Sequence, residues 1–409
     1  MPRIPVVAAV FVCAAACWTT LVAQRMDAFV ESRHHPAIAY GRGAFDNPVA
    51  DLNARLADGD ATLEFDAGTG YLRATLDALG ISPDSQLLVF SPTSFQASHI
   101  AYDNPRAIYF NDTVAVGWIR GAPLLELTAQ DPRHGTVFYS IGQSPTDRPT
   151  FGRQEQCVSC HLTWDTLGVP GLTIRTTSRR ADGELVNGGP VDHRRPFAER
   201  WSGWFVTGAF SPGAHLGNRR LVPGGSTPPA AAGGLASISG EFDTTGYLRT
   251  TSDAVALMVL EHQTQAANMS TRAGWEARLG DPVRTRAAAE ALADYLLFVD
   301  EAPLPQPLLM TGAFAGAFPA GGPRDSHGRS LRDLRLDGRL MQYPLSYMVY
   351  TPMFEALPRE SAAIVHERLA AVLDGRDASP KYAHLTPDLR RAIVEILRET
   401  RPALAAGVR

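Results

Sequence analysis

Between about residues 60 and 142, short apolar runs alternate with turn-forming residues, a pattern typical of β-strands. Asn111-Asp112, Arg120-Gly121 and His134-Gly135 predict turns between the runs. We therefore expect a small antiparallel sheet or meander, with one helix near 71–79 packed on it. The predicted strands cover residues 87–90, 107–110, 114–118, 124–127 and 136–140.

The pattern changes after Phe151. Residues 151–250 are rich in Gly, Pro, Arg and Trp and lack a clear period, and a low-complexity loop covers 223–240. Apolar spacing beyond residue 250 predicts helices, with starts indicated at Ser252-Asp253 and Thr386-Pro387-Asp388. The predicted helices cover residues 252–273, 283–299, 330–341, 359–373 and 387–399. The fold class expected is α+β: a β-rich N-terminal domain over 26–150, then a mainly helical, loop-rich domain over 151–409.

Composition narrows the class of protein. The 409 residues are 45% hydrophobic and 20% charged, which excludes a disordered chain, a collagen-like repeat and a polytopic membrane protein. A net charge of −4 without long basic runs argues against nucleic acid as a partner. The four cysteines lie in two places along the sequence: Cys13 and Cys17 are close together near the N-terminus, and Cys157 and Cys160 are three residues apart. No further cysteines remain for a disulfide framework.

The first 25 residues predict an export signal or an N-terminal membrane anchor. A basic Arg3 precedes residues 4–23, which carry no charge. At about 1.5 Å per residue, such a segment spans the ~30 Å hydrocarbon core of a bilayer. A cleaved signal, an uncleaved anchor and a lipidated Cys17 all remain open, and each places the rest of the chain outside the cytoplasm. A buried core helix is the alternative.

One motif carries chemistry. Cys157-Val-Ser-Cys160-His161 matches C-x-x-C-H, the attachment pattern of c-type haem. Two cysteines on one helical turn can form thioethers with the two vinyl groups of one porphyrin, and the next histidine can bind the iron. The motif occurs once, so we predict one haem c per chain, with Cys157 and Cys160 as covalent attachments and His161 as proximal iron ligand.

A closely spaced cysteine pair can also serve as a redox pair or as part of a zinc site. A thioredoxin-like redox pair follows a strand and opens a helix, whereas the polar residues Arg153-Gln-Glu-Gln156 precede this motif. A structural zinc site needs four ligands, and no second cysteine pair follows. Both alternatives are less consistent with the sequence than haem c.

The sixth iron ligand decides the type of haem protein. A second Met or His typifies an electron carrier, whereas an open site permits ligand binding or catalysis. His215, in a glycine-flanked loop, and His262, on an apolar helix, are the best distal candidates. Each has a structural alternative: a turn histidine for His215 and a core histidine for His262. A methionine ligand and an open position also remain.

Other residues could support a haem. Trp201, Trp204 and Phe205 could wall the cofactor or close a core. Asp253 and Glu261 could orient a ligating histidine, or act as a helix cap and a surface charge. Arginines after the motif could bind haem propionates, or be solvated. These are Arg175, Arg179, Arg180, Arg194, Arg195 and Arg200.

Several strings give the chain a family resemblance over roughly three quarters of its length. They are 109–118, 157–161, 201–204, 215–218, 260–263, 324–333 and 343–347. In these strings the chain resembles a group of uncharacterised exported haem-c proteins of bacteria. That group has a Thr-His-Gly shortly before the His-Leu/Met-Gly-Asn string, where this chain has Thr207-Gly-Ala-Phe-Ser211 without histidine. The resemblance implies covalent haem and export but no particular reaction.

The sequence therefore predicts an extracytoplasmic monohaem c-type cytochrome in one-electron transfer. A redox partner protein is expected, in the periplasm or at the membrane, where residues 4–23 could anchor the chain. One alternative is a haem c enzyme, peroxidase-like or a small-molecule oxidoreductase, with an open distal face. The other is a haem-based sensor or structural partner of a membrane complex, with the β-rich domain as its docking surface.

Overall fold

The computed structural model describes residues 33–408, apart from 43, 181, 212–213, 222–233, 306–307 and 309–311. The predicted export segment at 4–23 lies outside the described residues. Within the described ranges, no helix combines the length and apolar character needed to cross a bilayer.

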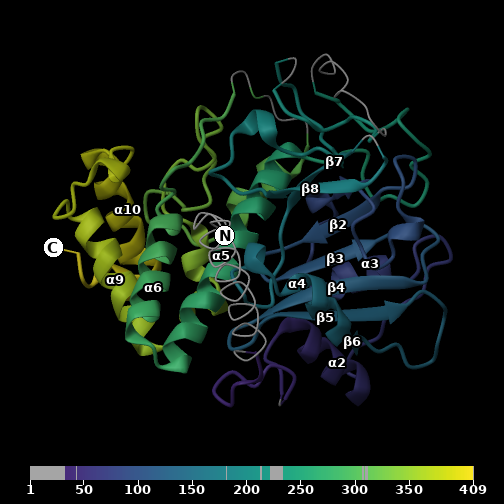
Figure 1. Ribbon diagram of the computed structural model, residues 1–409, viewed down its shortest axis with the longest axis horizontal. Helices are drawn as coiled ribbons and strands as arrows, with labels where there is room; N and C mark the ends of the chain where they lie inside the picture. Colours follow the sequence, from purple (N-terminus) through teal and green to yellow (C-terminus); the bar gives the residue numbers. More distant parts are fainter. Residues whose placement is uncertain are drawn as a thin grey trace, which may run out of the picture.

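A seven-stranded antiparallel sheet forms the N-terminal half (Figure 1). Its five central strands follow one another in sequence, so the predicted meander is confirmed, with turns at the three predicted places. The order across the sheet is β6-β5-β4-β3-β2-β1-β9, and β7 and β8 form a separate two-stranded sheet. The strands are β1 Leu87–Val89, β2 Arg106–Phe110, β3 Val114–Trp118, β4 Leu124–Asp131, β5 Gly135–Gly142, β6 Gly152–Arg153, β7 Arg175–Arg179, β8 Leu185–Pro190 and β9 Trp204–Phe205.

The two faces of the sheet are covered differently. Along β4, buried residues alternate with half-buried ones, as a strand with one fully covered face should. The covered face packs on α2 (Pro48–Asp58) and α3 (Leu72–Ala78), which bury Leu52, Leu72 and Leu76 against it. This agrees with the predicted helix at 71–79. The opposite face is only partly covered, and the cysteine motif lies on it.

The C-terminal half is mainly helical. The longest helix, α5, begins after Asp253, whose carboxylate accepts hydrogen bonds from the backbone N–H groups of Val255 and Ala256, the predicted N-cap. Thr386 caps α10 in the same way. The helices are α4 Val158–His161, α5 Ala254–Leu279, α6 Pro282–Leu296, α7 Phe314–Ala317, α8 Pro352–Glu355, α9 Arg359–Leu373, α10 Pro387–Thr400 and α11 Pro402–Ala405.

The predicted helix at 330–341 is wrong. This segment is an irregular loop with an isolated bridge between Leu334 and Met341. The Asp333 carboxylate accepts a hydrogen bond from the Ser330 N–H, and Gly338 takes a left-handed φ of 74°. Both features favour turns over a helix. Leucines at helical spacing misled the prediction, because they are buried from a loop.

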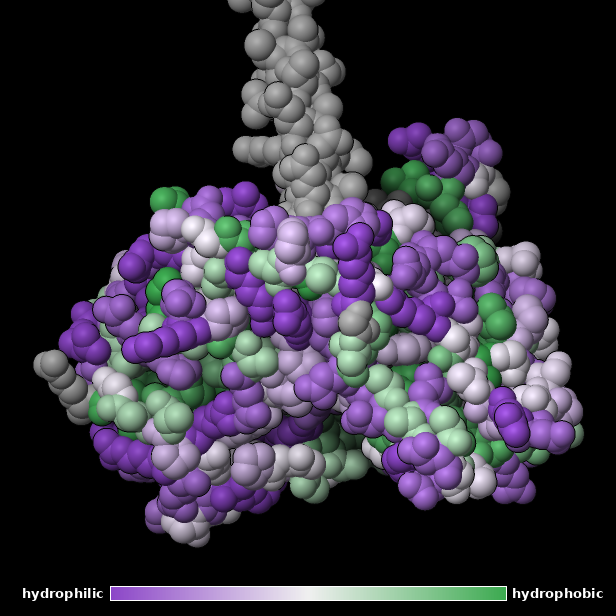
Figure 2. All heavy atoms as spheres, turned by 90° about the horizontal axis from the view of Figure 1, so that it is seen from below, coloured by the Kyte–Doolittle hydropathy of each residue, from purple (hydrophilic) through white to green (hydrophobic). Residues whose placement is uncertain are grey.

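One apolar core joins the two halves. Leu87, Val89 and Phe110 of the sheet belong to the same cluster as α5, α6 and α9. The sheet also receives β6 and β9 from the segment after residue 150. Outside this core, the face seen in Figure 2 carries mainly hydrophilic side chains with small hydrophobic groups between them. The mixed α+β architecture is thus established, while a domain boundary at residue 150 stays a prediction.

Candidate haem site

The cysteine motif forms one tight turn against the sheet. The 3-10 turn η3 (Glu155–Cys157) leads directly into α4 (Val158–His161), which lies in front of β4 and β5 in Figure 1. Val158 is buried in a small cluster with Phe138 of β5 and anchors the turn. Cys157 is partly buried, Cys160 is exposed, and neither thiol forms a disulfide. Residues three apart on a helical turn share a face, so both thiols can reach one ligand.

His161 is held in one orientation by two contacts. Its Nδ1 lies 3.0 Å from the Gly171 carbonyl oxygen, and its ring lies against Phe138, with centroids 4.9 Å apart. A carbonyl oxygen only accepts, so Nδ1 carries the hydrogen and Nε2 carries the free lone pair. Burial lowers the pKa of His161, which favours this neutral form. A metal-binding histidine is prepared in the same way, by donating its other N–H to an oxygen.

Small side chains next to His161 form a platform on the sheet. Cross-strand partners share a face, and Phe138 pairs with Thr128, which pairs with Ala115. Gly117, two residues along from Ala115, shares that face. Ala115, Gly117 and Thr128 are all partly exposed, and we call these three residues the shelf. With Phe138, the shelf extends over β3, β4 and β5 on the face of the sheet against which the cysteine motif packs.

Charged residues border the shelf. Arg106 of β2 and Glu126 of β4 form an ion pair at 3.6 Å, and both side chains are about a quarter exposed. Arg106 and Arg175 lie close enough to His161 to lower its pKa further. Glu126 similarly contributes to a raised pKa at Cys157, so the ion pair and the cysteine motif are neighbours.

Two exposed aromatic residues lie in the segments around the shelf. Trp164, 48% exposed, follows His161 by three residues. Phe95, 71% exposed, follows Ser94, whose hydroxyl donates a hydrogen bond to Glu126. Single exposed apolar side chains are common on protein surfaces, so these two rings do not mark a site by themselves, but they are available to cover a ligand bound beside the motif.

His262 is not placed as a free ligand. It is fully buried, its Nδ1 lies 2.9 Å from Nδ1 of His193, and its Nε2 lies 2.6 Å from Oγ of Ser346. The ring stacks between Tyr295 and Phe298. Burial lowers its pKa to about 3, so the ring is neutral. Both ring nitrogens have a partner within the core, so these contacts are those of a structural core histidine, the alternative given above for His262.

His215 lies in a box of aromatic rings. Phe197, Trp201 and Phe210 surround it with ring centroids 4.9–6.3 Å away. Its Nδ1 accepts a hydrogen bond from the Gly217 N–H, and burial lowers its pKa to about 4. The contacts of His215 and His262 involve none of the residues around His161, so the structure does not bring either predicted distal ligand into the motif's surroundings.

The other predicted residues have mostly structural places. Trp201, Trp204 and Phe205 are buried in the core, and Asp253 caps α5. The buried Glu261 pairs with Arg200 at 3.2 Å and accepts a hydrogen bond from the Trp201 indole.

Among the predicted arginines, Arg175 lies close enough to His161 to lower its pKa, and its guanidinium is bound to Asp165. Three others also have acidic partners: Arg180 with Glu184, Arg194 with Asp192 and Arg195 with Glu199. Arg179 donates to the Gly183 carbonyl.

The motif's surroundings differ from those of a reactive thiol pair. Burial raises the pKa of Cys157 to about 11, whereas catalytic redox cysteines have lowered pKa values. A two-residue edge strand, β6, does precede the motif. The polar residues at 153–156 did not predict this strand. Among the described residues, no three His, Cys, Asp or Glu side chains are grouped to hold a metal ion.

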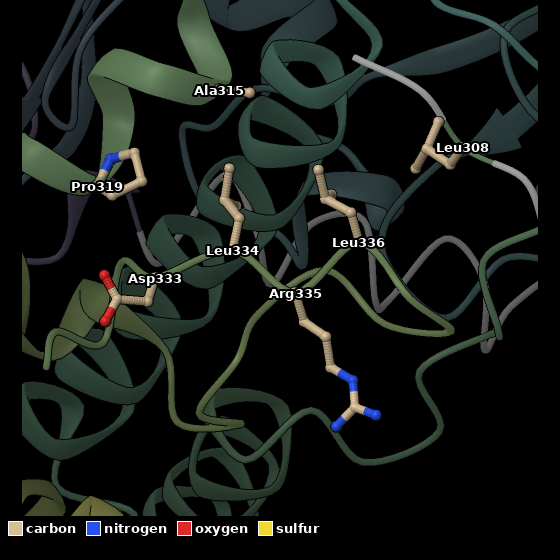
Figure 3. A pocket seen from close by; sticks show the side chains of 7 residues that line it. All are labelled: Leu308, Ala315, Pro319, Asp333, Leu334, Arg335 and Leu336. Atoms are coloured by element: carbon tan, nitrogen blue, oxygen red, sulfur yellow. The ribbon is translucent and has the colours of Figure 1, made fainter.

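A pocket of about 560 Å³ lies away from these residues, in the loop that was predicted as a helix (Figure 3). Leu334 and Leu336 point to one side of the loop and Arg335 to the other. The Asp333 carboxylate at its edge is already paired with Arg324 at 3.0 Å. None of the predicted site residues lines this pocket.

Comparisons with known proteins add no assignment: no family model, no curated protein and no solved structure matches the chain. The resemblance to exported haem-c proteins therefore stays a prediction. Sequence reasoning also missed the shelf, Arg106 and Glu126. The available signal was alternation in β2 to β4, which places these residues on one face, but it does not indicate which face meets the cysteine motif.

Proposed function

We propose that this chain is a monohaem c-type cytochrome that works outside the cytoplasm in one-electron transfer. The observation that carries the proposal is the His161 geometry within the C-x-x-C-H turn. Nδ1 is committed to the Gly171 carbonyl, so Nε2 is free to bind iron. Cys157 and Cys160 stand on the same turn, and neither is used in a disulfide.

The surroundings fit a haem. The side chains of the shelf are small and partly exposed, and Phe95 and Trp164 offer exposed aromatic surface that a porphyrin could cover. Once attached, the group would supply an iron that cycles between the ferric and ferrous states. This chain's residues would bind it covalently, orient the proximal imidazole and exclude water on the sheet side.

Location and partners belong to the same proposal. The uncharged segment at 4–23 supports export to the periplasm, with a cytoplasmic-membrane anchor if it is retained. Electron transfer requires a redox partner protein, and the near-neutral chain does not favour nucleic acid.

A haem c enzyme with an open distal face is the second candidate. The specific observation in its favour is the placement of the two predicted distal histidines. His262 uses both ring nitrogens within the core, and His215 sits in its aromatic box. If neither binds the iron, the sixth position is available to a small ligand.

The first experiment tests for covalent haem. The full chain is expressed with haem-c maturation machinery, and denaturing gels are stained for haem. We expect one haem per chain, lost in Cys157→Ala/Cys160→Ala and retained in the matched control Ser159→Ala, which changes the same turn. An unstained wild-type chain, or a stain that survives the double substitution, would overturn the proposal.

The second experiment separates the two candidates. Absorption spectra of the ferric and ferrous forms are recorded with and without carbon monoxide. A low-spin ferrous form that does not bind carbon monoxide supports electron transfer and excludes an enzyme with an open sixth iron position. A high-spin form that binds carbon monoxide readily supports the second candidate.

A further inference from the structure

Arg106 has hydrogen-bonding capacity that the described residues do not use. Its side chain is 23% exposed, and the described residues offer it one carboxylate, Glu126, at 3.6 Å. This distance exceeds that of a good hydrogen bond. Its Nε is buried and has no hydrogen-bond partner within the described part of the chain. Burying an unpaired donor of a charged group is costly, so the Nε of Arg106 is available to an acceptor from water or from a bound group.

The position of Arg106 indicates where that acceptor would come from. Its side chain passes over Gly117 of the shelf, where Cδ lies 3.5 Å from the point a Cβ atom would occupy. It shares the face of β2 with Ile108 and Phe110, the face on which the cysteine motif lies. Arg175, the other arginine near His161, is already bound to Asp165.

We propose that Arg106 binds a carboxylate of the haem group at the shelf. This inference rests on the proposed function, because a haem carries two propionates. The guanidinium is planar and presents paired N–H donors that match a carboxylate bidentately. Arg106 thereby acts as a positioning residue: it orients the group and places a positive charge beside it, while Glu126 remains its ion-pair partner within the protein.

The test compares Arg106→Leu with wild-type holoprotein, after both are shown to carry covalent haem. The midpoint potential is measured between pH 5 and 9. Removing the cation leaves a propionate uncompensated, which stabilises the ferric form. We expect the equilibrium constant for reduction to fall about tenfold, which lowers the midpoint potential by about 59 mV for one electron. We also expect the pH range over which the potential changes to shift to higher pH, because the pKa of the propionate rises when the guanidinium is removed.

Two further variants give the matched comparison. Arg106→Lys keeps the charge and is expected to retain most of the potential, which a purely steric role would not explain. Arg120→Leu removes an arginine of similar exposure (30%) that pairs with Asp243 at 3.0 Å, and it should leave the potential unchanged. Should Arg106→Leu fail to fold, Arg106→Lys and Glu126→Gln remain informative, because Glu126→Gln is expected to raise the potential.

The outcomes separate this inference from the proposed function. A wild-type chain without covalent haem ends both. A haem-bearing chain in which Arg106→Leu keeps the wild-type potential and pH profile overturns the role of Arg106 alone. Equal potential shifts in Arg106→Leu and Arg120→Leu would also overturn it, because they would show a general charge effect.

Discussion

Replacing His262 with alanine tests whether this histidine is a core residue or an iron ligand. The ring is fully buried, stacked between Tyr295 and Phe298, and hydrogen-bonded to His193 and Ser346. Removing a large buried side chain costs about 2–5 kcal/mol. Each polar partner left unsatisfied adds about 1–3 kcal/mol, although water entering the cavity offsets part of this. We expect a loss of about 3–6 kcal/mol in the free energy of unfolding.

The assay is urea denaturation followed by far-UV circular dichroism, with the absorption spectrum of the proposed haem recorded in native buffer. The matched control is His327→Ala, an exposed histidine, for which we expect a change within about 0.5 kcal/mol. In native buffer the haem spin state should not change in His262→Ala. A stability loss below about 1 kcal/mol, or a change from low-spin to high-spin haem in the folded variant, would refute the core assignment.

Two predictions follow from the same geometry. First, the protein should lose stability on acidification: burial holds the pKa of His262 at about 3, against 6.5 when exposed, so the unfolded chain binds the proton first. The stability that this group contributes is therefore present above pH 6.5 and falls by up to about 1.4 kcal/mol per pH unit between pH 6.5 and 3. In His262→Ala the free energy of unfolding should depend less on pH, which urea titrations at pH 7, 5 and 4 would measure. Second, Gly117→Val places a branched side chain on the shelf and should lower haem incorporation at least severalfold, measured as haem per chain, whereas Gly142→Val at the exposed end of β5 should not. Equal incorporation in the two glycine variants would contradict the shelf as the haem surface.

The local patterns in the sequence were good predictors of elements. Alternating apolar residues and turn signals between 87 and 140 indicated the meander, since each strand pairs with its sequence neighbour. The caps at Asp253 and Thr386 marked helix starts, because capping uses residues within three positions. Leucine spacing at 330–341 failed, because a loop can also bury every third or fourth side chain against a core.

The sequence by itself determined the motif's local chemistry: two thiols and an imidazole brought onto one turn by their spacing. Only the tertiary structure decided which groups surround that turn. His262 meets His193 and Ser346, which are 69 and 84 residues away. Arg106, whose Nε has no hydrogen-bond partner in the described part of the chain, belongs to β2, far before the motif. The physical reason is that periodicity reports which residues face inward, whereas burial partners depend on how sheet and helices pack across long separations in sequence.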